Sequence, residues 1–340
     1  MSCKYAVLAI PRIGQFPELT QDHDLGFSTY ILQEPETILS TIPEHPWKEW
    51  LGSLAWEDLF RANHIVVSHC PTQTPEVLDG ENVALESHLT NMVYKALFLV
   101  APFCGSGGEI RLFSGKGHLT EGKVHIDDIR SHQILDEWVM PGCRHHANYW
   151  RWLQATFLEN AVIDDWRTVI AQLHALRNST TTYIYSLALE VFRLALIEKW
   201  ADVVFPHVVR SIETLIALPP MGAFRRTYGG QHTMAKEFAA RILRYYPITA
   251  NHLYQLNQAD LTTLLEDIYQ VRSDSVHGKP LAWTLRQRNP NLPDDELMKL
   301  EYVSETAARH LLRSALTNTT WMTALADRAT LEQAWLAGNL

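Results

Sequence analysis

The sequence lacks any apolar run long enough to cross a membrane. Its longest candidate, ALFLVAPF at 96–103, falls far short of the roughly 18–20 residues that span a bilayer. The opening MSCKYAVLAIPRIG has no apolar core followed by the small-residue cleavage site of a secretion signal. Cysteines are also few, and their spacing forms no disulfide framework, which is typical of a reducing cytosol: Cys3, Cys70, Cys104 and Cys143. We therefore expect a soluble cytoplasmic protein with no membrane partner.

Basic residues are fewer than acidic residues: the chain has 29 Lys and Arg against 38 Asp and Glu. The formal net charge at pH 7 is −9, which argues against a protein that coats nucleic acid, because coating requires many contacts between cations and phosphates. A local basic cleft remains compatible with this charge, since the field inside a cleft is set by the groups nearest to it. Hydrophobic residues make up 46% and charged residues 20% of the chain, which indicates a folded globular protein.

The first part of the chain, residues 1–147, mixes strand-like runs with turns and one clear helix. The helix is predicted over 84–100, where apolar residues recur at helical spacing. Short runs of β-branched and aromatic residues between Gly, Pro, Asn or Asp predict strands at 5–10, 27–32, 64–69, 109–113 and 123–129. We expect an α+β domain with a sensing or regulatory role.

From residue 148 to residue 340 the pattern changes to one helix after another. Helices are predicted at 182–204, 207–218, 232–246 and 261–277, with a last helical stretch from 297 to 336. The helix at 207–218 is expected to begin just after Pro206, because proline is favoured in the first turn of a helix. We therefore predict a second, all-α domain.

The stretch LTTLLEDIYQVRSDSVHGKP at 261–280 places a permanent cation on an apolar helix face. Leu261, Leu265 and Ile268 share this face with Arg272. Burying an unpaired guanidinium would cost several kcal/mol. Arg272 is therefore expected to meet a carboxylate, to reach solvent, or to line a polar cleft or an interface.

A histidine closes the same helix. Gly278 and Pro280 predict that the helix ends near His277. An imidazole there could swing toward Arg272, and a histidine beside an arginine suits phosphate chemistry, because one moves protons and the other binds phosphate oxygens. The alternative is a structural Arg272 paired with an acid such as Glu213, with His277 acting only as a cap.

Three segments resemble the HEPN superfamily, and within it the ApeA-like branch found in bacterial defence and toxin-type proteins. They are HVVRSIETLIAL (207–218), KEFAARILRYY (236–246) and IYQVRSDSVHG (268–278), which carries an R-x4-H motif. The resemblance covers about 182–318. It implies an all-α bundle that forms a homodimer, in which the two R-x4-H motifs meet and form one RNA-cleaving site without metal or cofactor.

The resemblance also implies roles for individual residues. Arg272 and His277 match the motif arginine and histidine. The 2′-hydroxyl of RNA would attack the adjacent phosphorus, with His277 as general base or acid and Arg272 stabilising charge on the phosphoryl oxygens. Ser273 and Asp274 follow the arginine and could orient the imidazole, although many active members carry Asn, Asp or His where this chain has Ser273. Arg210 and Glu213 form an R-x-x-E element, which we assign to structural pairing.

A basic cluster lies in or beside the same region, and it is either a track for the RNA backbone or an ordinary solvated helix face: Arg225, Arg226, Lys236, Arg241 and Arg244. The expected partners are an RNA substrate, a second copy of the chain, and a trigger protein or antitoxin. The alternative function is a non-catalytic HEPN-type module that binds a partner protein, RNA or a nucleotide.

Three other motifs carry less weight. GCRHH, with Cys143, His145 and His146, has no second element that would complete a zinc site. The glycine-rich CGSGGEIRLFSGKG at 104–117 fails the spacing of a P-loop, and its GSGG is expected to form a hairpin turn. His69 and Cys70 are neighbours on a predicted strand, so they point to opposite faces and make a poor nucleophile pair.

Overall fold

The computed structural model describes residues 2–10, 22–32, 40–42, 44–53, 56–57, 64–71, 80–100, 109–121, 123–137, 160–176, 183–198, 201–219, 233–250, 256–277 and 294–340. Within these residues the chain forms two compact units: a sheet unit that extends to His174 and a helical unit that begins at Ala175. The predicted mixed architecture, α+β followed by helices, is confirmed. None of the helices in the described ranges combines the length and the apolar character that crossing a membrane requires.

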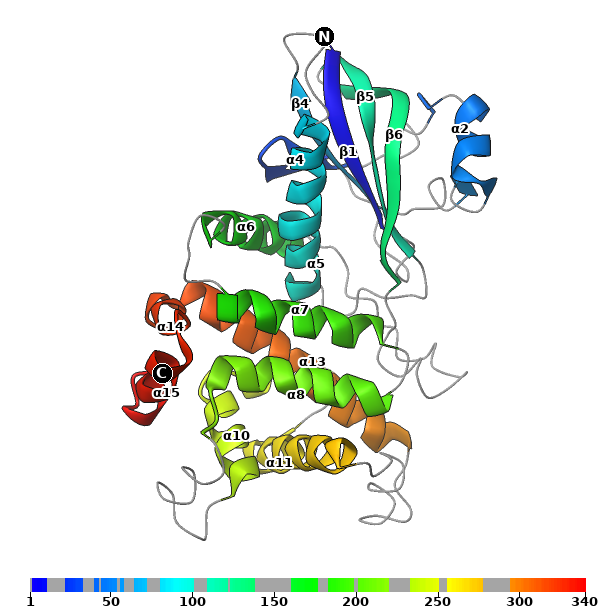
Figure 1. Ribbon diagram of the computed structural model, residues 1–340. Coiled ribbons are helices and arrows are strands. Elements are labelled where there is room, and N and C mark those ends of the chain that lie inside the picture. The colour runs from blue at the N-terminus through cyan, green and yellow to red at the C-terminus, as the bar shows by residue number, and fades with distance from the viewer. Residues whose placement is uncertain are drawn as a thin grey trace. The chain divides into compact units, whose positions relative to one another are not determined.

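The sheet unit is built on six antiparallel strands in the order β2-β3-β4-β1-β5-β6 (Figure 1). Their bounds are β1 (Ser2–Ile10), β2 (His23–Gly26), β3 (Thr29–Ile31), β4 (His64–Pro71), β5 (Glu109–Thr120) and β6 (Lys123–Glu137). β1 pairs with β4 on one side and with β5 on the other, and it is buried along almost its whole length. The first strand of the chain is therefore an interior strand of the sheet.

Alternate residues of β1 face two different layers. Tyr5, Val7 and Ala9 belong to an apolar cluster that includes Leu51 of the short helix α2 (Glu44–Leu51). The other face is covered by a continuous helical segment (Figure 1): α4 (Gly80–His88), the π-helical turn η1 (Leu89–Tyr94) and α5 (Lys95–Val100). The helix predicted over 84–100 is confirmed within this segment.

The hairpin of β5 and β6 is much longer than the predicted strands at 109–113 and 123–129. Gly115 and Gly117 lie inside β5, where residues without a side chain let the neighbouring backbone approach closely. A Cβ atom on Gly115 would lie 2.0 Å from the carbonyl oxygen of Asp128. The Tyr5 hydroxyl donates a hydrogen bond of 2.6 Å to that same oxygen, so β1, β5 and β6 are joined at this point.

Helix α6 (Asn160–Leu176) belongs mostly to the sheet unit, although its sequence lies beyond the predicted boundary at 147. The Trp166 side chain is fully buried, and its indole N–H donates to the carbonyl oxygen of Val93, at 2.8 Å. Arg167 donates to the carbonyl oxygen of Asp24 in β2. The change from strand to helix in the sequence therefore precedes the change of unit, since the first helix after that point packs back on the sheet unit.

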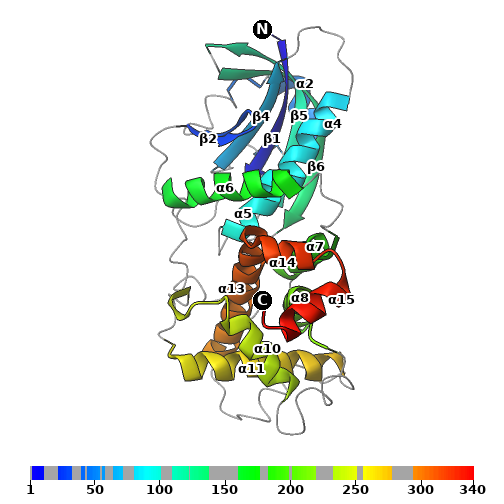
Figure 2. The same ribbon diagram turned by 90° about the vertical axis from the view of Figure 1, so that its left-hand side faces the viewer.

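The helical unit is arranged around α8. Its helices are α7 (Tyr183–Ile197), α8 (Ala201–Ile216), α10 (Met234–Leu243), α11 (Gln258–Val276), α13 (Asp294–Thr317), α14 (Thr319–Ala324) and α15 (Arg328–Leu336). α8 lies between α7 and α11 (Figure 1), and α13 packs across α7, α8 and α11 (Figure 2). The apolar side chains of α8 from Val204 to Ile216 are almost all fully buried.

Two helix boundaries differ from those predicted. Pro206 lies inside α8 and not in its first turn, because α8 begins at Ala201. A proline at this depth removes only one backbone hydrogen bond near the beginning of the helix, and the heavy burial of α8 outweighs that loss. The predicted helical stretch at 297–336 is divided into α13, α14 and α15, with Asn318 and Asp327 capping the last two.

Candidate functional site

The sequence of α11 brings Arg272 to the edge of the core. The Asn257 side chain caps the helix by accepting a hydrogen bond from the backbone N–H of Asp260. Leu261, Leu265 and Ile268 are all fully buried, as the periodicity predicts. The next position on this face is Arg272, whose side chain keeps 27% of its accessible surface.

Arg272 meets a carboxylate of α8. Its Nη2 lies 2.8 Å from Oε2 of Glu213, whose side chain is 20% exposed. The Nε of Arg272 is buried and has no hydrogen-bond partner among the described residues. Burial raises the pKa of the Glu213 carboxyl above its ordinary value, and the guanidinium groups of Arg272, Arg328 and Arg210 oppose this rise without cancelling it. The ion pair is therefore held in a poorly solvated place at some cost in desolvation.

A pocket of about 520 Å³ opens beside this ion pair. α8 contributes His207, Arg210 and Glu213 at helical spacing, and further lining comes from Arg272 on α11 and Arg328 on α15. Among the described residues that line the pocket there are three arginines and one carboxylate, and a second carboxylate, that of Glu332, pairs with Arg328 from outside the lining. The site therefore keeps an excess of positive charge when the histidine is neutral. We call it the arginine pocket.

His207, in the first half of α8, is the histidine that lines the arginine pocket. Burial lowers the pKa of its imidazole below the ordinary value; Glu198 opposes this shift and Arg210 adds to it. The ring is therefore neutral at neutral pH, where it can either donate or accept a hydrogen bond.

His277 lies where the sequence predicts, at the C-cap of α11. Its backbone N–H donates to the carbonyl oxygens of Ser273 and Asp274, at 3.2 and 3.1 Å, and its side chain is exposed. Across the described ranges the His277 ring has no hydrogen bond, whether to Arg272, Ser273 or Asp274; the Asp274 carboxylate accepts one from Gln270. A single chain therefore does not bring the motif arginine and histidine together.

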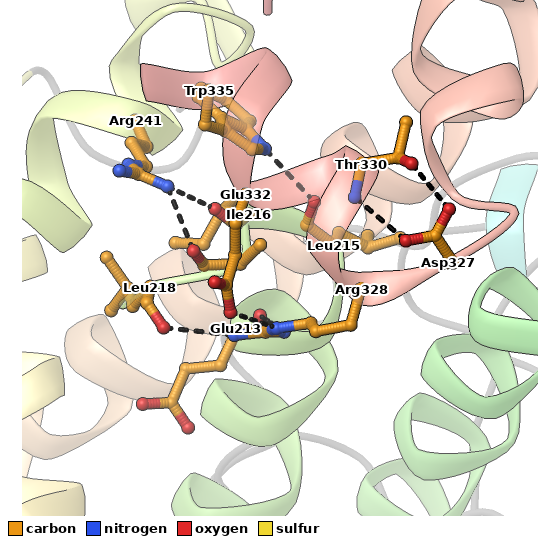
Figure 3. Close-up of polar contacts among 11 residues, drawn as sticks. Glu213, Leu215, Ile216, Leu218, Arg241, Asp327, Arg328, Thr330, Glu332 and Trp335 are labelled. Atoms are coloured by element: carbon orange, nitrogen blue, oxygen red, sulfur yellow. Dashed lines mark hydrogen bonds and ion pairs between the residues drawn. The ribbon is translucent and has the colours of Figure 1, made fainter. Parts of the chain in front are cut away.

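Side chains from two other helices cap the carboxyl end of α8 (Figure 3). Arg241 of α10 donates to the carbonyl oxygens of Ile216 and Ala217, at 2.6 and 3.1 Å. Arg328 donates to that of Leu218, at 3.0 Å, and the indole N–H of Trp335 donates to that of Leu215, at 3.3 Å. The final carbonyl groups of a helix lack partners within the helix, so these contacts fix α10 and α15 at the end that borders the arginine pocket.

The predicted RNA track is corrected at Arg241. Its side chain is only 3% exposed and forms an ion pair with Glu237 as well as the contacts to α8, so it serves the fold and does not face a strand of RNA. Lys236 and Arg244 are exposed, and Arg244 donates to the carbonyl oxygen of Leu340. Arg225 and Arg226 lie outside the described residues.

The structural pairing assigned to Arg210 and Glu213 is corrected in its partner. Glu213 pairs with Arg272, and Arg210 forms no ion pair or hydrogen bond through its side chain with any described residue. Arg210 is exposed at the edge of the arginine pocket. The R-x-x-E element thus supplies one group that holds Arg272 and one guanidinium that is open to a ligand.

The other motifs supply no second site where they fall on described residues. Gly115 and Gly117 lie in an antiparallel strand, which no P-loop can occupy. GCRHH, GSGG and the Cys70 side chain lie outside the described residues, and within the described ranges no group of three or more His, Cys, Asp or Glu could hold a metal ion. His69 is half-buried, and burial lowers the pKa of its imidazole.

Sequence reasoning missed three residues of the arginine pocket: His207, Thr214 and Arg328. The signal for the first two was present, because His207, Arg210 and Thr214 recur at the spacing of one helix face. Arg328 directly follows Asp327, which caps α15, and that cap marks only the beginning of a helix. The contact of α15 with the end of α8 arises only in the folded chain, so the local sequence around Arg328 does not reveal it.

Comparison of the chain with protein-family models, with curated proteins and with solved structures finds no match in any of the three.

Proposed function

We propose that the helical unit is a metal-independent endoribonuclease of the HEPN type. The observation that carries the proposal is the placement of Arg272, which lines an open pocket of net positive charge, on the same helix as an exposed His277 at the helix end. Both groups belong to the R-x4-H motif. An arginine that can reach phosphate oxygens and a histidine that can exchange protons with solvent are the two groups that cleavage by a 2′-hydroxyl requires.

In this proposal the 2′-hydroxyl attacks the adjacent phosphorus, the bond to the 5′-oxygen breaks, and the proton of the hydroxyl ends on the leaving oxygen. The products are a 2′,3′-cyclic phosphate and a free 5′-hydroxyl. His277 removes or delivers the proton, which is worth about 10²–10⁴-fold in rate. Arg272 stabilises the charge that develops on the phosphoryl oxygens, since a guanidinium binds two of them at once.

A second copy of the chain completes the proposed site. Within one chain His277 does not contact Arg272, so catalysis needs the helix end of another copy or a change of conformation. Val276, the neighbour of His277 on α11, is apolar and 59% exposed. An interface between two copies would cover Val276 and bring two helix ends together.

The alternative is a non-catalytic module that binds RNA, a nucleotide or a partner protein. The ion pair of Arg272 with Glu213 favours it, because this contact gives the arginine a structural role inside one chain. The pair is only partly covered, however, and it borders an open pocket, so the arginine is not sealed away from ligands.

The sheet unit is proposed to sense a trigger or to restrain the nuclease, as part of a defence or toxin system in which an antitoxin could take part. The support for this is the division of the chain into two compact units, only one of which carries the R-x4-H motif.

The proposal is tested with end-labelled RNA in the presence of EDTA. The wild-type protein is compared with Arg272→Ala and with Arg130→Ala, a surface arginine of the sheet unit paired with Asp128. We expect cleavage with cyclic phosphate ends for the wild type and the control, loss of cleavage for Arg272→Ala, and no cleavage of a 2′-deoxy strand. Equal cleavage by Arg272→Ala, or products with a 5′-phosphate, would contradict the proposal.

A further inference from the structure

The arginine pocket holds more positive charge than its ion pair uses. Arg272 pairs with Glu213 and Arg328 pairs with Glu332, while Arg210 has no carboxylate partner among the described residues. This excess of one positive charge occurs in a chain whose formal net charge is −9. Cations that gather in a hollow of an acidic protein raise the local concentration of anions far above that over the rest of the surface. The pocket is therefore suited to an anion.

The three guanidinium groups differ in how far their donors are already used. Arg328 is held by Glu332 and by the carbonyl oxygen of Leu218, so it is fixed in place. The Nη2 of Arg272 donates to Glu213, while its Nε is buried and meets no acceptor in the described part of the chain. Arg210 has none of its donors engaged by a described residue. An incoming oxyanion would therefore engage Arg210, whose donors remain available.

The size and the apolar part of the lining indicate what is attached to the anion. A volume of about 520 Å³ is much larger than a phosphate group needs and lies within the range of pockets for small organic ligands. Leu218, Met234 and Val276 form an apolar part of the wall, against which a sugar or a base can pack. Thr214 and the neutral His207 add polar groups that can bond to hydroxyls.

We propose that the arginine pocket binds the phosphate of a nucleoside monophosphate, either as a free nucleotide or as the phosphorylated end of an RNA strand. Arg210 closes on the phosphate, Arg328 provides a fixed positive wall, and Arg272 is shared with the ion pair. This inference goes beyond cleavage, because binding requires no reaction and a phosphorylated end has no scissile bond on its outer side.

Titration calorimetry of the full chain tests the inference with 5′-AMP, 3′-AMP and inorganic phosphate, and with adenosine as the uncharged control. We expect a monophosphate to bind and adenosine not to bind. Arg210→Gln should weaken binding about 10- to 100-fold, the effect of removing one charge-assisted contact. Arg130→Gln changes the net charge equally at a distant surface position and should leave binding unchanged.

The source of the phosphate is separated with oligodeoxynucleotides that carry or lack a terminal phosphate, which the proposed nuclease cannot cleave. Binding of the phosphorylated strand well above that of AMP assigns the pocket to strand ends, and the reverse assigns it to free nucleotides. The inference is overturned if no monophosphate and no phosphorylated strand binds, or if Arg210→Gln binds as the wild type does. Loss of RNA cleavage alone would overturn the proposed nuclease and leave this inference standing.

Discussion

The guanidinium of Arg272 and the carboxylate of Glu213, 59 positions apart in the chain, form an ion pair of 2.8 Å between α11 and α8. The pair joins the helix that carries the R-x4-H motif to the central helix of the unit. It also influences the charge of the arginine pocket, because Glu213 is the one carboxylate among the described residues that line it. The first predictions follow from this pair.

Replacing Glu213 with glutamine is predicted not to destabilise the protein at pH 7. Burial raises the pKa of Glu213 even against three arginines, so its ionised form is less favourable in the folded than in the unfolded chain. Glutamine keeps the shape and one acceptor without the charge. We expect chemical denaturation at pH 7 to give Glu213→Gln a free energy of unfolding equal to or above that of the wild type. A clear loss of stability would show that attraction to Arg272 outweighs desolvation.

The same carboxyl gives a pH dependence with a definite sign. Because the folded pKa of Glu213 is raised, the folded chain keeps this proton in a pH window where the unfolded chain has lost it. The contribution of Glu213 to stability is complete below the ordinary glutamate value and is lost as the pH rises through the folded value. The difference in unfolding free energy, wild type minus Glu213→Gln, should therefore fall with rising pH across that window. A difference that rises would contradict the stated direction.

Removing Glu213 should also strengthen anion binding in the arginine pocket. In Glu213→Gln the Nη2 of Arg272 is no longer held by a carboxylate, and the net charge of the pocket increases by one unit. We expect the affinity for 5′-AMP, measured by titration calorimetry, to rise by about 10-fold, which is of the order of one charge interaction near a protein surface. Glu332→Gln serves as the matched control. It removes the carboxylate that pairs with Arg328 but lies outside the lining of the arginine pocket, so it should change the affinity less.

Arg241 is predicted to matter for stability and not for RNA binding. Arg241→Ala removes a part-buried ion pair to Glu237 and two buried hydrogen bonds to the end of α8, and should lower the free energy of unfolding by about 3 kcal/mol. Lys236→Ala, an exposed cation on the same helix, should change it by less than about 0.5 kcal/mol. Denaturation with urea measures both. A small effect of Arg241→Ala would restore it as a candidate surface contact.

Association of two copies is predicted to depend on Val276. Val276→Asp places a charge on the exposed apolar residue beside His277, so it should weaken the dimer while leaving the free energy of unfolding of the single chain within about 0.5 kcal/mol of the wild type. Sedimentation equilibrium measures the association. Leu336→Asp, an equally exposed apolar residue on α15, is the control and should leave association unchanged. A wild-type protein that stays monomeric at high concentration would contradict the composite site.

Much of the helical unit follows from periodicity. The apolar face of α11, its end at His277 and the buried face of α10 are local properties, set by spacing and by capping residues. What the sequence does not encode locally is where a polar side chain finds its partner. Arg241 lies beside Phe238 and Ile242 on α10, yet only the arrival of the end of α8 explains its burial.

The sheet unit was harder to predict for a related reason. β2, with the sequence HDLG, carries too few β-branched or aromatic residues to be recognised, and it exists because it pairs with β3. The length of β5 depends on glycines that normally indicate turns but here allow close contact with β6. Both features are determined by strand pairing, which periodicity along a single segment does not reveal.

The most direct test of the central proposal is the rate of RNA cleavage in EDTA by the wild type and by His277→Ala. His277 is exposed and its side chain holds no described contact, so its removal should leave folding intact. His118→Ala, an exposed histidine of the sheet unit, is the control. The account predicts cleavage by the wild type and the control, and a rate at least about 100-fold lower for His277→Ala. Equal rates for all three proteins would contradict it.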